Sequence, residues 1–510
     1  MQPTRLASGW STYRSSRYQR GQALIYGIFI LISSLAALFF LFNTGQLTSE
    51  KTKLVNTADA VAYSAGVMHA RALNFDAYNN RALVANEVLV AQMVSLASWA
   101  SYANQHVQNL PSVFPECATE AGALYAAAIK FDPIYGVMCY FFVGLQGVTV
   151  DPVPPIIPAT LNAIVTGIES SKAAITSAQR VLHTPLFFER ARGDVMQAVA
   201  DRNYQGDGAV RVEPMLASAM IDDWRFFTHR FQDDERTRLA NLARTAAATD
   251  SFVRERNWTS RALLAPPGQI LCRLLGVRNS VRRRGGTELV GLDEWQAADT
   301  ESFWEFRDRR FLGFRTCTLR ENPIAFGGQE AAVAPAGNDS GAFLGGSQAT
   351  NPNAHSQINS GIWPQYTGIP SFYDLATAAT DPSSANLPNP QDPRLKFAVR
   401  LVRDRTAVRT SDGASQIRPS PRLNNFNSNL AGQVMSAIAT SEVYFDHPPD
   451  PTATGLSGGS IDNRNRYATD RGNPATREIG SLFNPYWQVR LIPNSATDIT
   501  VQQVRQGLAP

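Results

Sequence analysis

The hydropathy pattern of this chain begins with a long uncharged run near the N-terminus. Residues 23–42 read ALIYGIFILISSLAALFFLF, without a charged residue or a proline. A helix of this length rises about 30 Å, which is the thickness of the hydrocarbon core of a bilayer. The pattern therefore predicts a single transmembrane helix, with an anchor formed by Ala23, Leu24, Ile28, Phe29, Leu31, Leu35, Leu38, Phe39 and Phe42.

The residues before this run predict its orientation. The first 43 residues contain Arg5, Arg14, Arg17 and Arg20 and no acidic residue. Basic residues favour the cytoplasmic flank, so residues 1–22 are predicted to be a cytoplasmic leader and residues from about 44 onward to be exported. A buried core helix and a cleaved secretory signal are the alternatives. The apolar region of a signal normally spans about 7–15 residues, and the longer run here favours an uncleaved anchor.

An alanine-rich stretch without proline follows the apolar run. Between residues 43 and 110, apolar residues recur at alternating steps of three and four, which is the period of a helix. We predict one long helix that bends or folds back near Asn74–Asn80. Its apolar seam is expected to pack on the protein's own domain or between subunits of a homo-oligomer. The predicted seam residues are Leu47, Leu54, Ala58, Val61, Ala65, Met68, Ala72 and Phe75.

The remaining chain is predicted to change from helical to β-rich. Residues 111–250 are expected to be helical, with one helix over 159–200 that breaks near 183–185 and another over 213–249. Residues 251–510 are expected to form a β-rich exported domain with mobile loops at about 327–392 and 447–475. Its predicted strands are 303–307, 311–320, 395–403, 442–445 and 487–492, and residues 431–440 are predicted to be helical.

The predicted fold class is α+β. A single transmembrane helix continues into a long helical region, and an antiparallel sheet domain with long loops follows. This order of elements is a pilin-like arrangement.

Charge and motifs argue against several function classes. The formal net charge is +4, and the four leader arginines account for all of it, so we expect no nucleic-acid partner. Residues 455–459 match G-x-S-x-G around Ser457, but the Pro- and Gly-rich flanks predict a loop instead of the strand and helix that a nucleophile elbow requires. We predict no catalytic residue, no cofactor and no metal site. An anchored periplasmic hydrolase or sugar-binding protein, with Ser457 in its site, remains the alternative.

Residues 282–286 read RRRGG and predict a basic turn. The simplest interpretation is a solvated loop. The functional alternative is contact with anionic lipid or polysaccharide.

The chain contains four cysteines, Cys117, Cys139, Cys272 and Cys317. An exported compartment permits disulfides, and the local pairing, Cys117 with Cys139 and Cys272 with Cys317, is favoured among the three. Free buried cysteines are the alternative, and the spacing does not fit a zinc site.

Two segments near the N-terminus resemble pilus proteins. The junction Arg20-Gly21-Gln22 before an apolar helix resembles a type III prepilin leader site, which implies cleavage between Gly21 and Gln22. Tyr26 stands where such pilins usually carry glutamate. That junction, together with TKLVNTADAVAYSAG at residues 52–66, resembles the N-terminal module of TadG-like proteins of the Flp/Tad (tight adherence) pilus assembly system. The resemblance covers about residues 20–70.

This resemblance implies a non-enzymatic assembly component. Its expected location is the bacterial inner membrane, with one span, a cytoplasmic N-terminus and the bulk of the chain periplasmic or extracellular. The implied partners are other pilus-assembly or pilin-like proteins. A minor pilin or pseudopilin built into the filament is the alternative. Some TadG-like proteins end in a von Willebrand A domain, but its Asp-x-Ser-x-Ser motif is missing from this sequence.

Overall fold

The structure is a computed structural model of the whole chain, and it describes only part of it. Cys117, Ser457, the leader up to residue 19 and the predicted loop at 447–475 lie outside the described residues. The described residues are 20–114, 139, 156–213, 222–260, 263–264, 269–311, 314–333, 351–377, 387–389, 392–404, 407, 434–446 and 480–505.

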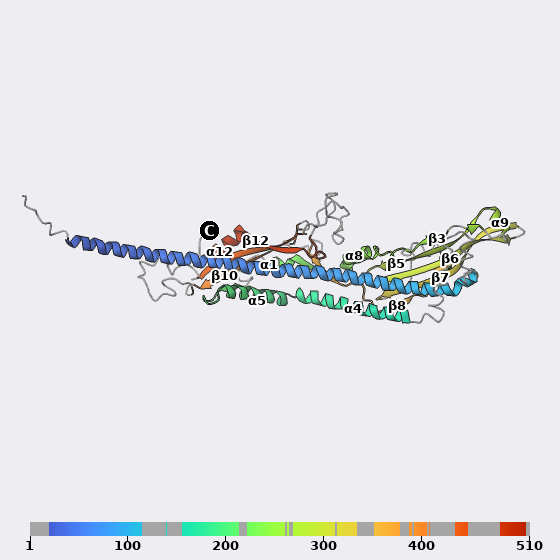
Figure 1. Cartoon of the computed structure of the whole chain (residues 1–510), viewed down its shortest axis with the longest axis horizontal. Coiled ribbons are helices and arrows are strands. Elements are labelled where there is room, and N and C mark those ends of the chain that lie inside the picture. The colour runs from blue at the N-terminus through green and yellow to red at the C-terminus, as the bar shows by residue number, and fades with distance from the viewer. Residues whose placement is uncertain are drawn as a thin grey trace, which may run out of the picture.

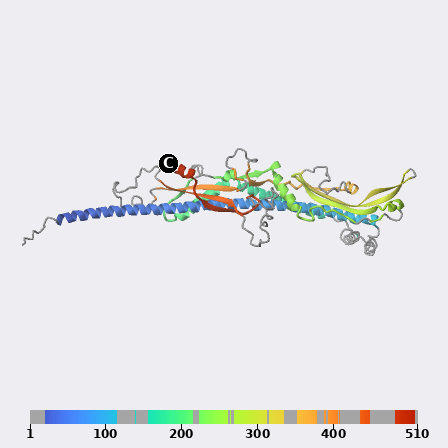
Figure 2. The ribbon, with the colours of Figure 1, turned by 90° about the horizontal axis from the view of Figure 1, so that it is seen from above.

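One continuous helix, α1 (Arg20–Val113), forms the axis of an elongated molecule (Figures 1 and 2). The predicted bend near Asn74–Asn80 is wrong. The side chain of Asn74 exchanges two hydrogen bonds of 3.0 Å with the backbone of Trp487, and that of Asn80 donates to the carbonyls of Tyr373 and Leu482. These amides dock other segments onto an intact helix and do not interrupt it.

The buried face of α1 repeats every 11 residues. Fully or almost fully buried positions recur as Leu54, Ala65, Asp76, Glu87 and Ser98, and again as Ala58, His69, Asn80, Ala91 and Tyr102. Eleven residues make three turns at 3.67 residues per turn, close to the 3.6 of a straight helix. A straight α1 therefore keeps one face against the rest of the protein over its whole packed length.

The first sheet packs on the half of α1 nearer its N-terminus. Its strand order is β1-β10-β11-β12, and all its pairings are antiparallel. Small and aliphatic side chains of α1, β10 and β11 form its core with residues of α5. The strands are β1 (Arg211–Val212), β10 (Arg394–Asp404), β11 (Val434–Phe445) and β12 (Trp487–Ile492).

The predicted helix at 431–440 is wrong for its described residues, because residues 434–440 form the first part of strand β11. Alanine favours helix, yet β11 pairs residue for residue with β10, from Asp404 opposite Val434 to Arg394 opposite Tyr444. Ala437 and Ala439 are buried against α1, so their small size serves close packing of a helix on a strand. Long-range pairing overrides local propensity here.

A second, larger sheet packs on the distal half of α1, in the order β3-β5-β6-β7-β8, with β4 paired to β5. Its long hairpin of β6 and β7 is antiparallel, whereas β7 and β8 are parallel. The prediction of strands at 303–307 and 311–320 corresponds to this hairpin. The strands are β3 (Trp258–Thr259), β4 (Leu263–Leu264), β5 (Arg278–Val290), β6 (Glu294–Phe311), β7 (Phe314–Ala332) and β8 (Gly361–Trp363).

The predicted loop at 327–392 is wrong for its described residues. Strand β7 continues to Ala332, because Gly327 lets its backbone lie against α1; a Cβ there would be 2.3 Å from the carbonyl oxygen of Ser98. Farther along lie α11 (Pro352–His355), β8 and β9 (Phe372–Leu375).

The predicted basic turn at 282–286 is also wrong, because these residues lie inside strand β5. The guanidinium of Arg283 lies 4.3 Å from the Tyr102 ring and pairs with Asp299. Arg282 lies over the Trp304 ring. These arginines belong to the packing of the sheet.

Helices α4 (Ile156–Leu182) and α5 (Pro185–Asn203) run antiparallel to α1, and their break at residues 183–184 is where the sequence predicts it (Figure 1). The rest of the predicted helical region 111–250 contains strands as well, because β1 and β2 pair with partners distant in sequence, β10 and β9. The other elements are α7 (Trp224–Phe227), β2 (Thr228–Phe231), η2 (Asp233–Arg236), α8 (Thr237–Ala247), α9 (Ile270–Leu274) and α12 (Ala496–Arg505).

Candidate functional site

The apolar segment at the start of α1 projects from the folded part of the molecule (Figure 1). Eight of the nine predicted anchor residues are exposed, and Phe39 is half-buried. None of the most apolar 18-residue window of α1 is buried, and α1 is the one described helix long and apolar enough to cross a membrane. Exposure of this much contiguous apolar surface to water is unfavourable, so the segment requires an apolar environment supplied from outside the chain. Gly21 and Gln22 lie in the first turn of α1.

A group of charged residues marks where packing begins. Glu50 is buried beside Arg403, whose guanidinium also donates to the carbonyls of Asp207 and Ala407 at 2.7 Å. Lys53 pairs with Asp207 at 2.5 Å. Burial raises the pKa of Tyr204, over whose ring both cations lie, to about 12. This group begins eight residues after Phe42, so the exposed apolar segment ends sharply.

Beyond this group, polar side chains occupy the buried face of α1. We call them the buried polar stripe, and they are His69, Asp76, Asn80, Glu87, Ser98, Tyr102 and His106. Buried polar groups are costly unless they are paired, and along the stripe these residues contact partners in several different elements of the surrounding structure.

His69 joins α1 to α5. Its Nε2 accepts a hydrogen bond of 2.8 Å from Arg192, and Arg192 forms a two-pronged pair with Asp222. Burial, and secondarily the charge of Arg192, hold the pKa of His69 well below its usual range. The imidazole is therefore neutral at neutral pH and acts as an acceptor.

Asp76 binds His183 at the break between α4 and α5. Asp76 Oδ2 lies 2.7 Å from His183 Nε2, and His183 Nδ1 lies 3.3 Å from the hydroxyl of Thr228. Carboxylate, imidazole and hydroxyl occur in the same order in hydrolase triads. Here the imidazole is only 7% exposed and stacks 4.0 Å from the ring of Tyr373. We assign the cluster a structural role, which is to fix the turn between the two helices.

Glu87 and Lys172 form the central buried ion pair. Glu87 Oε1 lies 2.6 Å from Lys172 Nζ, and Glu87 Oε2 accepts hydrogen bonds of 2.9 Å from Trp295 and Tyr366. Lys172 also contacts Glu169 at 2.7 Å and the carbonyl of Gly368 at 2.9 Å. One carboxylate thus ties α1, α4, the distal sheet and the loop before β9 together.

The distal end of the stripe holds two buried carboxylates of β6. Asp299 receives hydrogen bonds from Arg256, Arg283 and Ser98, and Glu301 contacts Tyr102 and His106. Burial alone would raise both pKa values. The charges of Arg256 and Arg283 outweigh it at Asp299, and contacts with His106 and Tyr102 outweigh it at Glu301, so both pKa values lie below their usual range.

Some of the predicted seam residues lie on the face of α1 that packs against the rest of the protein. Leu54, Ala58, Val61, Ala65 and Ala72 are buried within the chain, Leu47 and Met68 are half-buried, and Phe75 is 42% exposed. The predicted steps of three and four average 3.5 residues, so the predicted face drifts about 20° per seven residues away from that of a straight helix. The polar stripe was missed, although the 11-residue spacing of Asp76 and Glu87 would have revealed it.

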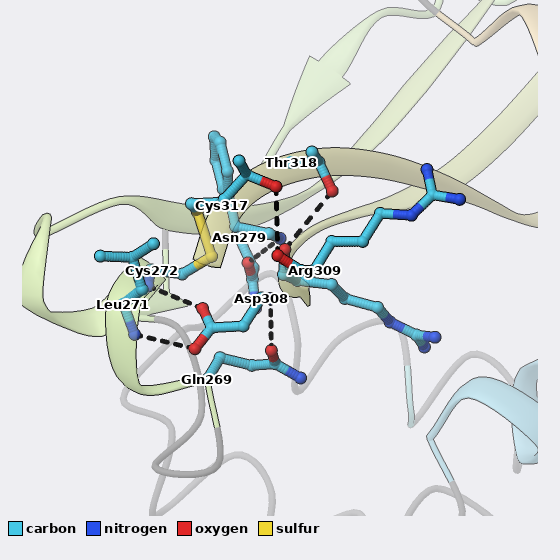
Figure 3. Close-up of a disulfide and its surroundings, with 11 residues drawn as sticks. Gln269, Leu271, Cys272, Asn279, Asp308, Arg309, Cys317 and Thr318 are labelled. Atoms are coloured by element: carbon cyan, nitrogen blue, oxygen red, sulfur yellow. Dashed lines mark hydrogen bonds between the residues drawn. A yellow bond between two sulfur atoms is a disulfide. The ribbon is translucent and has the colours of Figure 1, made fainter. Parts of the chain in front are cut away.

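Among the cysteines, Cys272 of α9 is bonded to Cys317 of β7, with 5.2 Å between their Cα atoms (Figure 3). Cys139 is also disulfide-bonded, and Cys117 lies outside the described residues. No group of three metal-binding side chains occurs within the described part of the chain.

These features define a class: an elongated α+β protein whose axial helix exposes an apolar segment of membrane-spanning length at one end. Residues 21–72 match the sequence model of a family described as Flp pilus-assembly TadE/G-like, and the resemblance to TadG-like proteins is confined to this segment. The match covers about a tenth of the chain, and it supports a relation to Flp/Tad pilus proteins. No curated protein and no solved structure gave a significant match.

Proposed function

We propose that the protein is a membrane-anchored, exported and non-enzymatic component of a Flp/Tad-like pilus assembly system. The observation that carries this proposal is the extent of the family match. Residues 21–72 contain the exposed apolar segment, the charged group at Glu50 and the first packed turns of α1. The matched segment is thus a membrane span joined directly to the start of a folded domain.

In this function α1 would lie in the bacterial inner membrane over residues 23–42, with its N-terminus in the cytoplasm and the rest of the chain in the periplasm or outside the cell. The leader arginines support this orientation, and a disulfide such as Cys272–Cys317 is stable in an oxidising compartment. The described part of the predicted seam is largely covered by the chain itself. A homo-oligomer through the N-terminal helix would therefore use the exposed residues 23–42.

Deletion in the source bacterium tests the proposal. We expect the deletion strain to lose surface Flp-type pili in electron micrographs, and expression of the full chain to restore them. A chain in which the span at 23–42 is replaced by alternating Leu and Ser should be made but should not restore pili. Normal piliation in the deletion strain would refute a role in pilus assembly.

A minor pilin built into the filament is the second candidate. One observation favours it: residues 23–42 of α1 are almost all exposed and mostly apolar, and from Glu50 onward the helix packs on largely antiparallel sheets, as expected for a pilin-like arrangement. The two candidates differ in processing. Intact-mass measurement of the protein from native membranes and from sheared filaments would give a chain starting at Gln22 for a processed pilin, and a retained leader for a static assembly component.

A further inference from the structure

The end of the molecule farthest from the apolar segment carries a second exposed apolar group. It is formed by α9 and by the adjoining ends of β6 and β7 (Figure 1), and we call residues 269–279, 305–311 and 314–320 the distal tip. Leu274 is 82% exposed and Phe314 is 76% exposed. Ile270, Leu275 and Leu319 are exposed as well. Large apolar side chains so strongly exposed, and so close together, indicate an interaction surface.

The distal tip is also strongly basic. Its arginines are all exposed, and they are Arg273, Arg278, Arg307, Arg309, Arg310, Arg315 and Arg320. The same residues include only two acids, Glu305 and Asp308. Glu305 pairs with Arg307, and Asp308 accepts hydrogen bonds from the backbone N–H groups of Leu271 and Cys272. Residues from 44 onward carry no net charge as a whole, so the exported chain outside the tip is net negative, and this local excess of positive charge is distinctive.

Several bonds hold the exposed side chains in place (Figure 3). The disulfide Cys272–Cys317 fastens α9 to β7, and Asp308 fixes the first turn of α9 at 2.8 and 2.9 Å. Asn279 accepts a hydrogen bond of 2.8 Å from the backbone N–H of Phe306. The disulfide and these hydrogen bonds therefore hold the backbone that exposes Leu274 and Phe314 to solvent in a fixed position.

We infer that the distal tip binds the surface of a bilayer containing anionic phospholipid. Arginine side chains can lay their stems along apolar surface while their guanidinium groups contact lipid phosphates, and leucine and phenylalanine enter the interfacial layer between them. Each basic residue near an anionic surface adds to the affinity. In Figure 1 this end tapers to α9 and one hairpin, a form that suits insertion into an interface better than contact with a broad protein face.

The lipid surface would be that of a second membrane. From Asn43 to Val113, α1 rises about 105 Å at 1.5 Å per residue. The tip therefore stands clear of the bilayer that holds residues 23–42, and the protein bridges two membranes. The bridging rests on the anchor proposed above, whereas lipid binding by the tip does not.

Vesicle capture tests the tip separately from the anchor. The full chain, wrapped in non-ionic amphipol, is coupled to beads through a tag after Pro510, and α12 places that end far from the tip (Figure 1). Fluorescent phosphatidylcholine vesicles with or without phosphatidylglycerol are then added. We expect capture of the anionic vesicles only. R309Q/R310Q/R315Q should weaken capture about a hundredfold, and L274S/F314S about tenfold or more.

The matched control is R71Q/R190Q/R202Q, which removes the same charge from exposed positions on α1 and α5. It should capture anionic vesicles like the unchanged chain. Equal losses in the two arginine triples, or equal capture of neutral and anionic vesicles, would overturn the proposal. Absence of capture by the unchanged chain would also overturn it, and would leave an acidic protein as the occupant of the tip. Carbonate extraction of native membranes tests the anchor independently.

Discussion

At the scale of single residues, a glycine inside α1 marks a close approach of a sheet to the helix. A Cβ at Gly66 would lie 2.3 Å from Cγ2 of Val489 and 3.0 Å from Oγ of Ser441. Glycine weakens helices, so its presence here is explained by packing rather than by backbone preference. It lies within the segment that matches the pilus-assembly family.

G66A is expected to lower the free energy of unfolding by about 1–3 kcal/mol, because overpacking outweighs the gain in helix propensity. G167A in α4 is the matched control, since a Cβ at that position meets nothing within 4 Å. It should raise the free energy of unfolding by about 0.5–1 kcal/mol. Urea unfolding of the purified chain measures both, and equal effects of the two substitutions would show that the close approach at Gly66 is unimportant.

Lys172 is the residue on which the central buried ion pair depends. K172M should lower the free energy of unfolding by about 3–5 kcal/mol, because it leaves the carboxylates of Glu87 and Glu169 buried without their cation. Adding E87Q should recover part of that loss. The control R225M breaks a surface pair with Glu189 and should cost less than about 1 kcal/mol. Denaturant titration of the unchanged chain and the three variants measures these free energies of unfolding. Similar losses for K172M and R225M would contradict the role given to Lys172.

At the scale of elements, the joint between α1 and α5 should be sensitive to mild acid. The pKa of buried His69 lies well below its ordinary value near 6.5, so below that pH the unfolded chain takes up a proton that the folded chain does not. The stabilisation from neutral His69 is complete above about pH 6.5 and falls by about 1.4 kcal/mol per pH unit below it, until the folded pKa is reached.

Unfolding measured between pH 7 and 5 checks this dependence on pH. H69Q retains an acceptor for Arg192 but has no titrating group, so its free energy of unfolding should fall less steeply with acid than that of the unchanged chain. H229Q, at a half-buried position where His229 pairs with Glu235, is the control and should preserve the slope. Parallel slopes for H69Q and the unchanged chain would refute this origin of the acid sensitivity.

The disulfide of the distal tip should stabilise the tip without affecting the stability of α1. C272S/C317S releases α9 from β7, so residues 269–279 should exchange amide hydrogens faster, while α1 and the sheet of β10 and β11 keep their protection. Hydrogen exchange read by mass spectrometry shows which peptides change. Faster exchange throughout α1 would mean that the disulfide supports the whole molecule and not only the tip.

The sequence pattern predicts the helix α1, the apolar span and the break between α4 and α5, because these signals are local. It does not predict that α1 is continuous. The asparagines at 74 and 80 resemble helix breakers in sequence, and only the distant backbone groups of Trp487 and Leu482 explain them. Strand β11 was missed for the same reason, since its alanines become strand residues only through pairing with β10. The buried polar stripe likewise depends on partners up to 402 residues away in the sequence.

At the scale of the whole molecule, the unbroken helix predicts a definite length. In a nanodisc, the folded part should extend roughly 100 Å beyond the bilayer, as 71 residues of α1 follow residue 42. Electron microscopy of single particles measures this directly. A helix folded back near Asn74–Asn80 would give about half that extension, and such particles would contradict the continuous α1.

The continuous α1 also has a mechanical consequence. One helix runs from the apolar segment to the middle of the hairpin that ends in the distal tip, and the strands of both sheets lie along it (Figure 2). A tensile force along the axis therefore loads many lateral contacts in shear at the same time. These contacts resist together and do not break one after another. The molecule is built to transmit tension between its two ends with little stretch.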